Sequence, residues 1–201
     1  MSGAEAKSAQ NTKPKRPLAP SMVKLNAQTA AMYAGAKQAK ARGEKVGWSS
    51  SIFPQEIAET LGLHVLYPEN WAAGIAARHQ ADPFLQTAEG QLEFSNDICA
   101  YAKVNLAYAE AMHEEGDLVL PDFLLCANNI CNQLTKWYER LAVKLEIPLF
   151  FIDCCYNAED YVTESRVRYI RAQIDEVIRG LSNFCGKQWD DQHFKEVMKI
   201  S

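Results

Sequence analysis

The stretch PDFLLCANNICNQLTKWYERLAVKLEIPLFFID, residues 121–153, decides the fold class. Two short apolar runs, Phe123–Cys126 and Pro148–Ile152, have the length of buried strands, and Asp153 ends the second one. Between them, Ile130–Leu145 is long enough for a helix. A strand, a helix and a second strand in this order predict two parallel strands that are joined by a helical crossover.

The same alternation extends toward the N-terminus. Val46–Trp48 is short and extended, and Leu63–Tyr67 is an apolar run that Pro68 ends. Helices are predicted at Phe53–Leu61, with a proline in the first turn, and at Asp97–Glu115, which a glycine ends. The pattern predicts an α/β domain with a flavodoxin- or Rossmann-like parallel sheet, in which ligands bind beyond the carboxyl ends of the strands.

Composition divides the chain into three segments. Residues 1–20 are polar, basic and Pro-containing, which predicts a disordered N-terminal arm. Residues 21–158 form the α/β domain and open with an amphipathic helix over Met22–Ala41. Residues 159–201 contain a long amphipathic helix that ends at a glycine. Because Phe194–Ser201 reads as a helix without a stop signal, we expect this last segment to hold the truncated start of a second domain.

Charge and apolar content exclude several classes of protein. Lys and Arg total 21 against 25 Asp and Glu, so the net charge is −4 and nucleic-acid binding is not expected. No apolar run approaches the ~20 residues that span a bilayer, and the N-terminus lacks the apolar core of a secretory signal. We therefore expect a cytoplasmic protein whose 6 cysteines are reduced thiols or metal ligands.

Two cysteines are placed where a thiolate is favoured. Cys99 lies at the opening of a predicted helix, and Cys131 lies at the start of another. A helix N-terminus lowers the pKa of a thiol and so favours the thiolate that binds iron or zinc. The alternative for either residue is a buried, inert thiol, because free cysteine packs as a small hydrophobic side chain. A CxxC pair, typical of zinc ribbons and redox sites, is absent from the sequence.

Polar residues also follow two of the predicted strands. Ser51 ends the GWSSS stretch, and Glu69 lies in the YPEN turn. Both are candidates for a site at the sheet edge, although a serine there also serves as a helix N-cap and a loop carboxylate is commonly solvated. His64 lies within an apolar strand and is expected in the core. The sequence has no Ser–His–acid spacing that indicates a hydrolase and no glycine-rich phosphate loop.

Three long motifs resemble a known family. GEKVGWSSSIFPQEIAETLGLHVLYPENWAAGIAA, NDICAYAKVNLAY and PDFLLCANNICNQLTKWYE are similar to the α subunits of the (R)-2-hydroxyacyl-CoA dehydratases. This group includes the 2-hydroxyisocaproyl-, phenyllactyl-, lactoyl- and 2-hydroxyglutaryl-CoA enzymes of amino-acid-fermenting anaerobes. The resemblance runs from about Gly43 to Ser201. It implies that this chain is the N-terminal part of a longer subunit with two flavodoxin-like domains and a homologous β subunit.

The resemblance also implies a chemistry. Members of the family remove water from a 2-hydroxyacyl-CoA to give the 2-enoyl-CoA through a ketyl radical. A separate ATP-dependent iron–sulfur activator supplies one electron, and a 4Fe-4S cluster held by three cysteines leaves one iron open to the substrate oxygen.

Four residues match the family's functional positions. Cys99 and Cys131 correspond to two cluster ligands, and the third cysteine ligand has no counterpart in this chain. Ser51 corresponds to a residue that hydrogen-bonds the substrate or an iron-bound oxygen, and Glu69 to a residue that transfers a proton. With two of three thiolates, the isolated chain is expected to be inactive.

Two other readings compete with this one. The chain could be a non-catalytic α/β binding or assembly module, or it could be similar to a benzoyl-CoA reductase subunit, which belongs to the wider family. The GWSSS, YPEN and NNICNQ motifs favour the 2-hydroxyacyl-CoA group.

Overall fold

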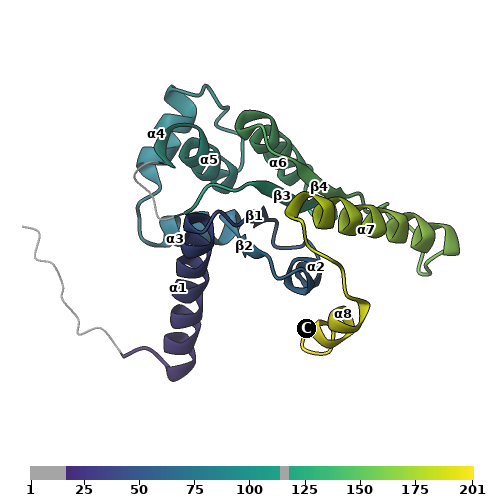
Figure 1. Cartoon of the computed structure of the whole chain (residues 1–201). Coiled ribbons are helices and arrows are strands. Elements are labelled where there is room, and N and C mark those ends of the chain that lie inside the picture. The colour runs from purple at the N-terminus through teal and green to yellow at the C-terminus, as the bar shows by residue number, and fades with distance from the viewer. Residues whose placement is uncertain (1–16, 114–117) are drawn as a thin grey trace, which may run out of the picture.

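A four-stranded, all-parallel sheet forms the centre of the molecule. The structure is a computed structural model and describes residues 17–113 and 118–201 (Figure 1). The strands are β1 (Val46–Ser49), β2 (His64–Leu66), β3 (Phe123–Ala127) and β4 (Leu149–Ile152), in the spatial order β2-β1-β3-β4. This order matches the first four strands of the flavodoxin-type sheet, so the predicted fold class is confirmed.

Each strand was anticipated within one or two residues. The central strands β1 and β3 are buried along their whole length, as expected for strands that are covered on both faces. Trp48 of β1 pairs with Leu66 on one side and with Leu124 on the other. This register aligns the carboxyl ends of the strands along one edge of the sheet.

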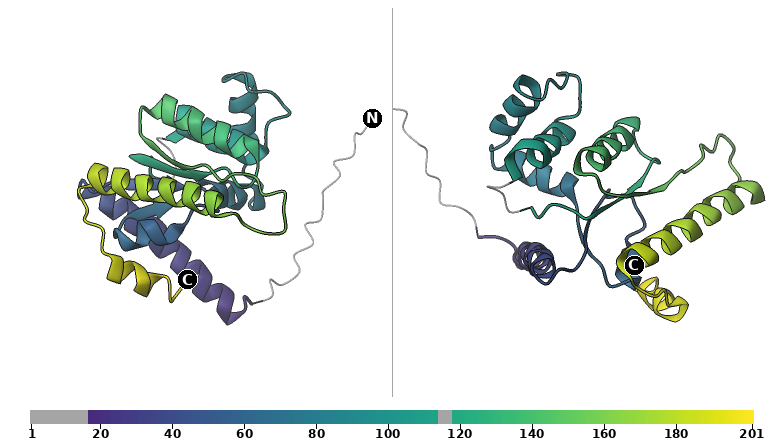
Figure 2. Two further views of the ribbon diagram at one scale, coloured as in Figure 1. Left: turned by 90° about the vertical axis from the view of Figure 1, so that its right-hand side faces the viewer. Right: turned by 45° about the horizontal axis from the view of Figure 1, so that its top comes forward.

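Helices of two groups cover the two faces. The helices are α1 (Pro20–Ala41), α2 (Gln55–Thr60), α3 (Pro68–Ala77), α4 (Asp82–Gly90), α5 (Ala100–Ala107), α6 (Asn132–Leu145), α7 (Glu164–Cys185) and α8 (Asp191–Val197). Figure 2 shows α5 and α6 on one side of the sheet and α2 and α7 on the other. None of the helices in residues 17–113 and 118–201 has the length and apolar character that crossing a membrane requires.

Strand alternation separates the core into two clusters. Leu124 and Cys126 of β3 point to the cluster that contains Tyr138 of α6. Phe123 and Leu125 point to the other cluster, with side chains of α2 and α7. Successive side chains of a strand face opposite sides, so one apolar strand supplies both cores.

The region between β2 and β3 differs most from the prediction. The YPEN segment is not a loop, because Pro68 ends the strand and also begins α3, where a proline in the first turn is tolerated. The sequence reading also missed α4, which has a proline near its start as well. The helix expected over Asp97–Glu115 is present but differs in its start and its form: α5 begins at Ala100 and passes without a break into a π-helical turn, η1 (Tyr108–Met112). Its expected end at Glu115 and Gly116 lies outside the described residues.

The two ends of the chain also differ from the prediction. Most of the predicted arm, residues 1–16, lies outside the described residues. The amphipathic pattern of α1 does not direct its first half into the core, because Met22 and Leu25 are exposed and only Ala36 and Ala39 are buried. In Figure 1 the N-terminal half of this helix extends away from the sheet. The helix expected over Phe194–Ser201 ends earlier, at Val197. The division at residue 158 stays a prediction.

Candidate functional site

The carboxyl edge of the sheet collects polar residues from all four strands. Ser50 and Ser51 follow β1, Glu69 lies just after β2, Asn128 follows β3 and Asp153 follows β4. In a parallel α/β sheet this edge is where ligands bind. We therefore take it as the candidate site.

Ser51 and Glu69 form a hydrogen-bonded pair at this edge. The Ser51 main-chain N–H donates to Glu69 Oε1 at 3.1 Å, and its hydroxyl donates to Glu69 Oε2 at 2.7 Å. Glu69 lies in the first turn of α3, where the helix dipole stabilises a negative charge. The structure thus brings together two residues that are 18 positions apart in the sequence. The pair presents a carboxylate and a hydroxyl, the groups that can accept and donate a proton.

Cys99 and Cys131 both lie at helix N-termini, as predicted. Cys99 is the N-cap residue of α5, Cys131 is the N-cap residue of α6, and both are exposed. The Cys99 N–H donates to the side-chain oxygen of Gln133 in the first turn of α6, at 3.3 Å. This bond joins the starts of the two helices. The roles of the two thiols stay predictions.

The other cysteines are more enclosed. Burial raises the pKa of the Cys126 thiol to about 12, and the negative charges of Glu69 and Cys131 add to the rise. Burial also raises the pKa of Cys185 to about 11 and moves that of Cys154 upward. A thiol with a raised pKa is a poor metal ligand at neutral pH because it stays protonated. These three enclosed thiols are therefore poor candidates for metal ligands, whereas Cys99 and Cys131 are exposed.

The chemistry of Cys99 and Cys131 fits part of a metal-cluster site. Thiolates are the preferred ligands of iron–sulfur clusters. However, within residues 17–113 and 118–201 no three His, Cys, Asp or Glu side chains lie close enough together to hold a metal ion. The described part of the chain thus supplies thiols that could belong to a cluster site and does not complete one.

Sequence reasoning missed two residues at the same edge. Asn128 and Asp153 each come directly after a strand, and their side chains are joined by a hydrogen bond. The signal that could have identified them is position, because the first polar residue after each predicted strand lies at the ligand-binding edge.

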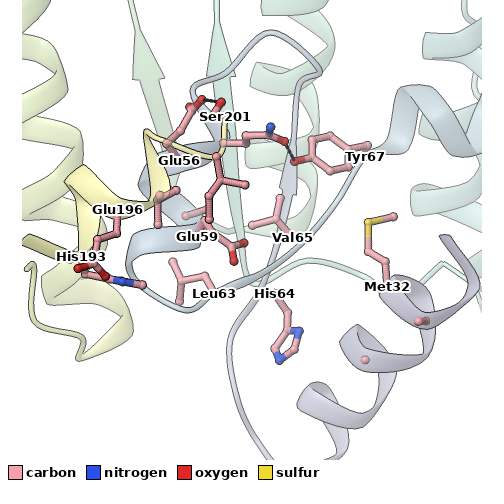
Figure 3. A pocket seen from close by; sticks show the side chains of 16 residues that line it. Met32, Glu56, Glu59, Leu63, His64, Val65, Tyr67, His193, Glu196 and Ser201 are labelled. Atoms are coloured by element: carbon pink, nitrogen blue, oxygen red, sulfur yellow. Dashed lines mark hydrogen bonds between the residues drawn. The ribbon is translucent and has the colours of Figure 1, made fainter. Parts of the chain in front are cut away.

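A cavity of about 780 Å³ lies away from this edge, beside the outer strand β2. Figure 3 shows it between α1, which carries Met32, and α8, which carries His193 and Glu196. Its walls are a mixture of apolar and acidic side chains. None of the four predicted site residues lines it, so the cavity adds no residue to the candidate site.

Comparison with known proteins identifies the family. The model of the family described as 2-hydroxyglutaryl-CoA dehydratase, D-component, matches residues 50–201. The chain is 54% identical to the (R)-phenyllactyl-CoA dehydratase alpha subunit of Clostridium sporogenes, over 83% of this chain and 41% of that protein. It is 50% identical to the (R)-2-hydroxyisocaproyl-CoA dehydratase alpha subunit of Clostridioides difficile, over 89% of this chain and 44% of that protein.

A third relative is more distant. The alpha subunit of (R)-2-hydroxyglutaryl-CoA dehydratase from Acidaminococcus fermentans is 36% identical, over 82% of this chain and 50% of that protein. The chain thus spans half, or slightly less than half, of the length of these relatives. The match to the family model covers most of the chain and contains Ser51, Glu69 and both exposed thiols, and this chain therefore belongs to the 2-hydroxyacyl-CoA dehydratase alpha subunit family.

Proposed function

We propose that this chain forms the N-terminal part of the α subunit of an (R)-2-hydroxyacyl-CoA dehydratase. The reaction removes the α-hydroxyl group and a β-hydrogen of a 2-hydroxyacyl-CoA and yields the 2-enoyl-CoA. The observation that carries the proposal is the family match across residues 50–201, the stretch that contains all four candidate residues. The hydrogen-bonded Ser51–Glu69 pair at the ligand-binding edge supports it independently.

In this proposal Cys99 and Cys131 hold part of a 4Fe-4S cluster. Each thiol is exposed at a helix N-terminus, where a metal cluster can reach it. When bound, such a cluster supplies low-potential one-electron chemistry and a Lewis-acidic iron. At least one further ligand is required, and we assign it to the part of the subunit that the relatives possess beyond the matched region.

Ser51 and Glu69 handle the substrate oxygen and a proton. The Ser51 hydroxyl, which donates to Glu69 Oε2 at 2.7 Å, is free to rotate toward a substrate oxygen when the acyl-CoA enters. Glu69 then keeps its bond from the Ser51 N–H and moves a proton at Oε2. A positioned carboxylate of this kind contributes a factor of about 10²–10⁴ to a rate.

The proposed route also defines partners. The dehydration is a radical reaction that starts with one electron from an ATP-dependent iron–sulfur activator. The names of the relatives as alpha subunits support a multi-subunit enzyme, and we propose a homologous β subunit as the partner. The enzyme is expected in the cytoplasm.

Iron and acid-labile sulfide per chain, measured after anaerobic purification, test the cluster. The chain is co-produced with the second half of an α subunit and with a β subunit. We expect about four irons per α subunit, lost on Cys99→Ala or Cys131→Ala. Cys155→Ala is the matched control, because Cys155 is a half-buried thiol outside the proposed ligand set. Iron that survives both ligand substitutions, or no iron in the unchanged protein, would favour the non-catalytic binding module.

Kinetics of the same enzyme test the pair. Glu69→Gln keeps the size of the side chain and removes its proton transfer, so kcat should fall by about 10² or more. Ser51→Ala should raise KM and lower kcat less strongly. Equal kcat in Glu69→Gln and the unchanged enzyme would remove Glu69 from the mechanism and leave the family membership intact.

A further inference from the structure

The ends of β3 and β4 are tied together by two side chains. Asn128 uses its amide N–H to donate to Asp153 Oδ1. The main-chain N–H of Cys154 donates to Asn128 Oδ1 at 2.6 Å, so both ends of the Asn128 amide are bound. Asn128 also donates its own main-chain N–H to the Ile152 carbonyl at 3.3 Å. The asparagine is thus fixed to the neighbouring strand by three hydrogen bonds.

Helix α7 holds the other side of Asp153. The Tyr169 hydroxyl donates to Asp153 Oδ2 at 2.5 Å, and this bond raises the pKa of Tyr169. The Gln173 side chain forms two hydrogen bonds with the Asp153 main chain. It accepts from the Asp153 N–H at 2.7 Å and donates to the Asp153 carbonyl at 2.7 Å. Both carboxylate oxygens, the N–H and the carbonyl of Asp153 therefore take part in hydrogen bonds. This leaves the carboxylate one orientation, with Oδ1 toward Asn128.

The loop that follows Asn128 carries Cys131. Only Asn129 and Ile130, both exposed, separate the bound asparagine from the N-cap thiol. At the far end the Cys131 carbonyl accepts from the Leu134 N–H at 3.1 Å, which anchors it to α6. A connection this short has little freedom once both ends are held. The position of the Cys131 thiol consequently depends on the hydrogen bonds that hold Asn128.

We propose that Asn128 and Asp153, supported by Tyr169 and Gln173, form a clamp that positions Cys131. The inference rests on the proposed function in one respect, namely that Cys131 is a cluster ligand. These four are positioning residues and do not touch the cluster. They act through the loop of residues 128–131.

Packing of α7 does not require this clamp. Val177 and Leu181 of α7 are buried in the apolar cluster that also contains Phe123 and Ile152. The clamp lies nearer the N-terminus of α7, where most side chains are exposed. The apolar cluster already holds α7 against the sheet. We therefore explain the polar network by the residues that it orients, and not by the stability that it adds.

Substitutions that swap the amide and the carboxylate between positions 128 and 153 test the clamp. Asn128→Asp removes the amide donor and sets a second carboxylate against Asp153. At Asn128, whose main-chain N–H donates to the Ile152 carbonyl, hydrogen–deuterium exchange in this chain should accelerate at least about tenfold, because a charge-assisted hydrogen bond that holds this residue is lost. The double variant Asn128→Asp/Asp153→Asn restores one donor and one carboxylate in exchanged positions, and exchange should return to within about twofold of the unchanged chain.

Two controls separate positioning from general destabilisation. Asn129→Asp introduces the same charge at the exposed neighbouring residue and should leave exchange of the loop unchanged. Alkylation of Cys126, which is fully buried, reports global opening and should not accelerate in Asn128→Asp. Loop exchange that is equal in the two single variants, or that the double variant does not restore, would overturn the clamp.

The iron content of the complete enzyme connects the clamp to the cluster. Asn128→Asp should lose at least half of its iron per α chain, and the double variant should recover it. Full iron in Asn128→Asp, together with accelerated loop exchange, would show that the loop does not position the ligand. No iron in the unchanged enzyme would instead contradict the proposed function, and the exchange measurements would still decide whether the clamp orders the loop.

Discussion

Gly47 in the centre of β1 offers the sharpest test of the packing. It pairs with Phe123 of β3 in the parallel register, and its neighbours Val46 and Trp48 face the opposite core. A Cβ atom at Gly47 would lie 2.3 Å from Phe123 Cε2 and 2.4 Å from Cζ. Carbon atoms in contact are normally about 3.5–4.0 Å apart. Gly47→Ala therefore forces the Phe123 ring to move by more than 1 Å.

The ring has no free space to move into. Phe123 is fully buried and meets Phe150 and Phe184 edge-on, with ring centroids 6.3 and 6.2 Å away. Overpacking of this kind costs about 1–3 kcal/mol, and the lower backbone entropy of unfolded alanine offsets about 0.5–1 kcal/mol of it. Because a Cβ 2.3 Å from a ring carbon is a severe clash, the cost lies at the upper end of this range, and we expect Gly47→Ala to lower the free energy of unfolding by about 2 kcal/mol.

Urea unfolding followed by tryptophan fluorescence measures the effect. With an m-value of about 2 kcal/mol/M, the midpoint should fall by about 1 M. The control is Gly90→Ala, since a Cβ at Gly90 of α4 meets no atom within 4 Å. Phe123→Leu should cost less in the Gly47→Ala background than in the unchanged chain. Equal midpoints for Gly47→Ala and the unchanged chain would refute the close packing of β1 on β3.

Three further predictions concern buried polar groups. Burial raises the pKa of Cys126 to about 12, above its value in the unfolded chain. The contribution of the protonated thiol to stability is therefore complete below about pH 8.5 and is lost as the pH rises toward 12. Alkylation at pH 9, followed by mass spectrometry, should leave Cys126 unlabelled in the folded chain. Glu89→Ala removes the carboxylate that lies 2.6 Å from the buried Lys103 ammonium and should cost about 3 kcal/mol, more than Lys103→Met, in urea unfolding. Tyr138→Phe removes a buried hydroxyl that has no hydrogen-bond partner among the described residues, so thermal unfolding should show unchanged or slightly higher stability. Tyr108→Phe, by contrast, loses a hydrogen bond to a main-chain carbonyl and should cost about 1 kcal/mol.

Local patterns were sufficient for much of the fold. The apolar runs before Asp153 and Pro68 are strands, and the segments after Cys99 and Cys131 begin helices. These features depend on hydrophobic periodicity and on the chemistry of the residues that start and stop elements. Both are properties of neighbouring residues, so the sequence displays them directly.

Two differences between the structure and the prediction have tertiary causes. The helix expected over Asp97–Glu115 passes into a π-helical turn at Tyr108, whose hydroxyl donates to the Leu118 carbonyl ten residues further along. His64 was expected in the core, but β2 is an outer strand and the His64 side chain is 40% exposed. The order of the strands decides which strand is exposed, and no local pattern encodes that order.

The sequence by itself determined the class of the fold, the kinds of its main elements, the four candidate residues and the resemblance to the family. Only the tertiary structure decided which of these residues meet. Ser51 contacts Glu69 across 18 residues, and Asn128 contacts Asp153 across 25 residues. The physical reason is that parallel pairing in one register carries the ends of strands that are remote in the chain to a single edge, where short side chains can reach one another.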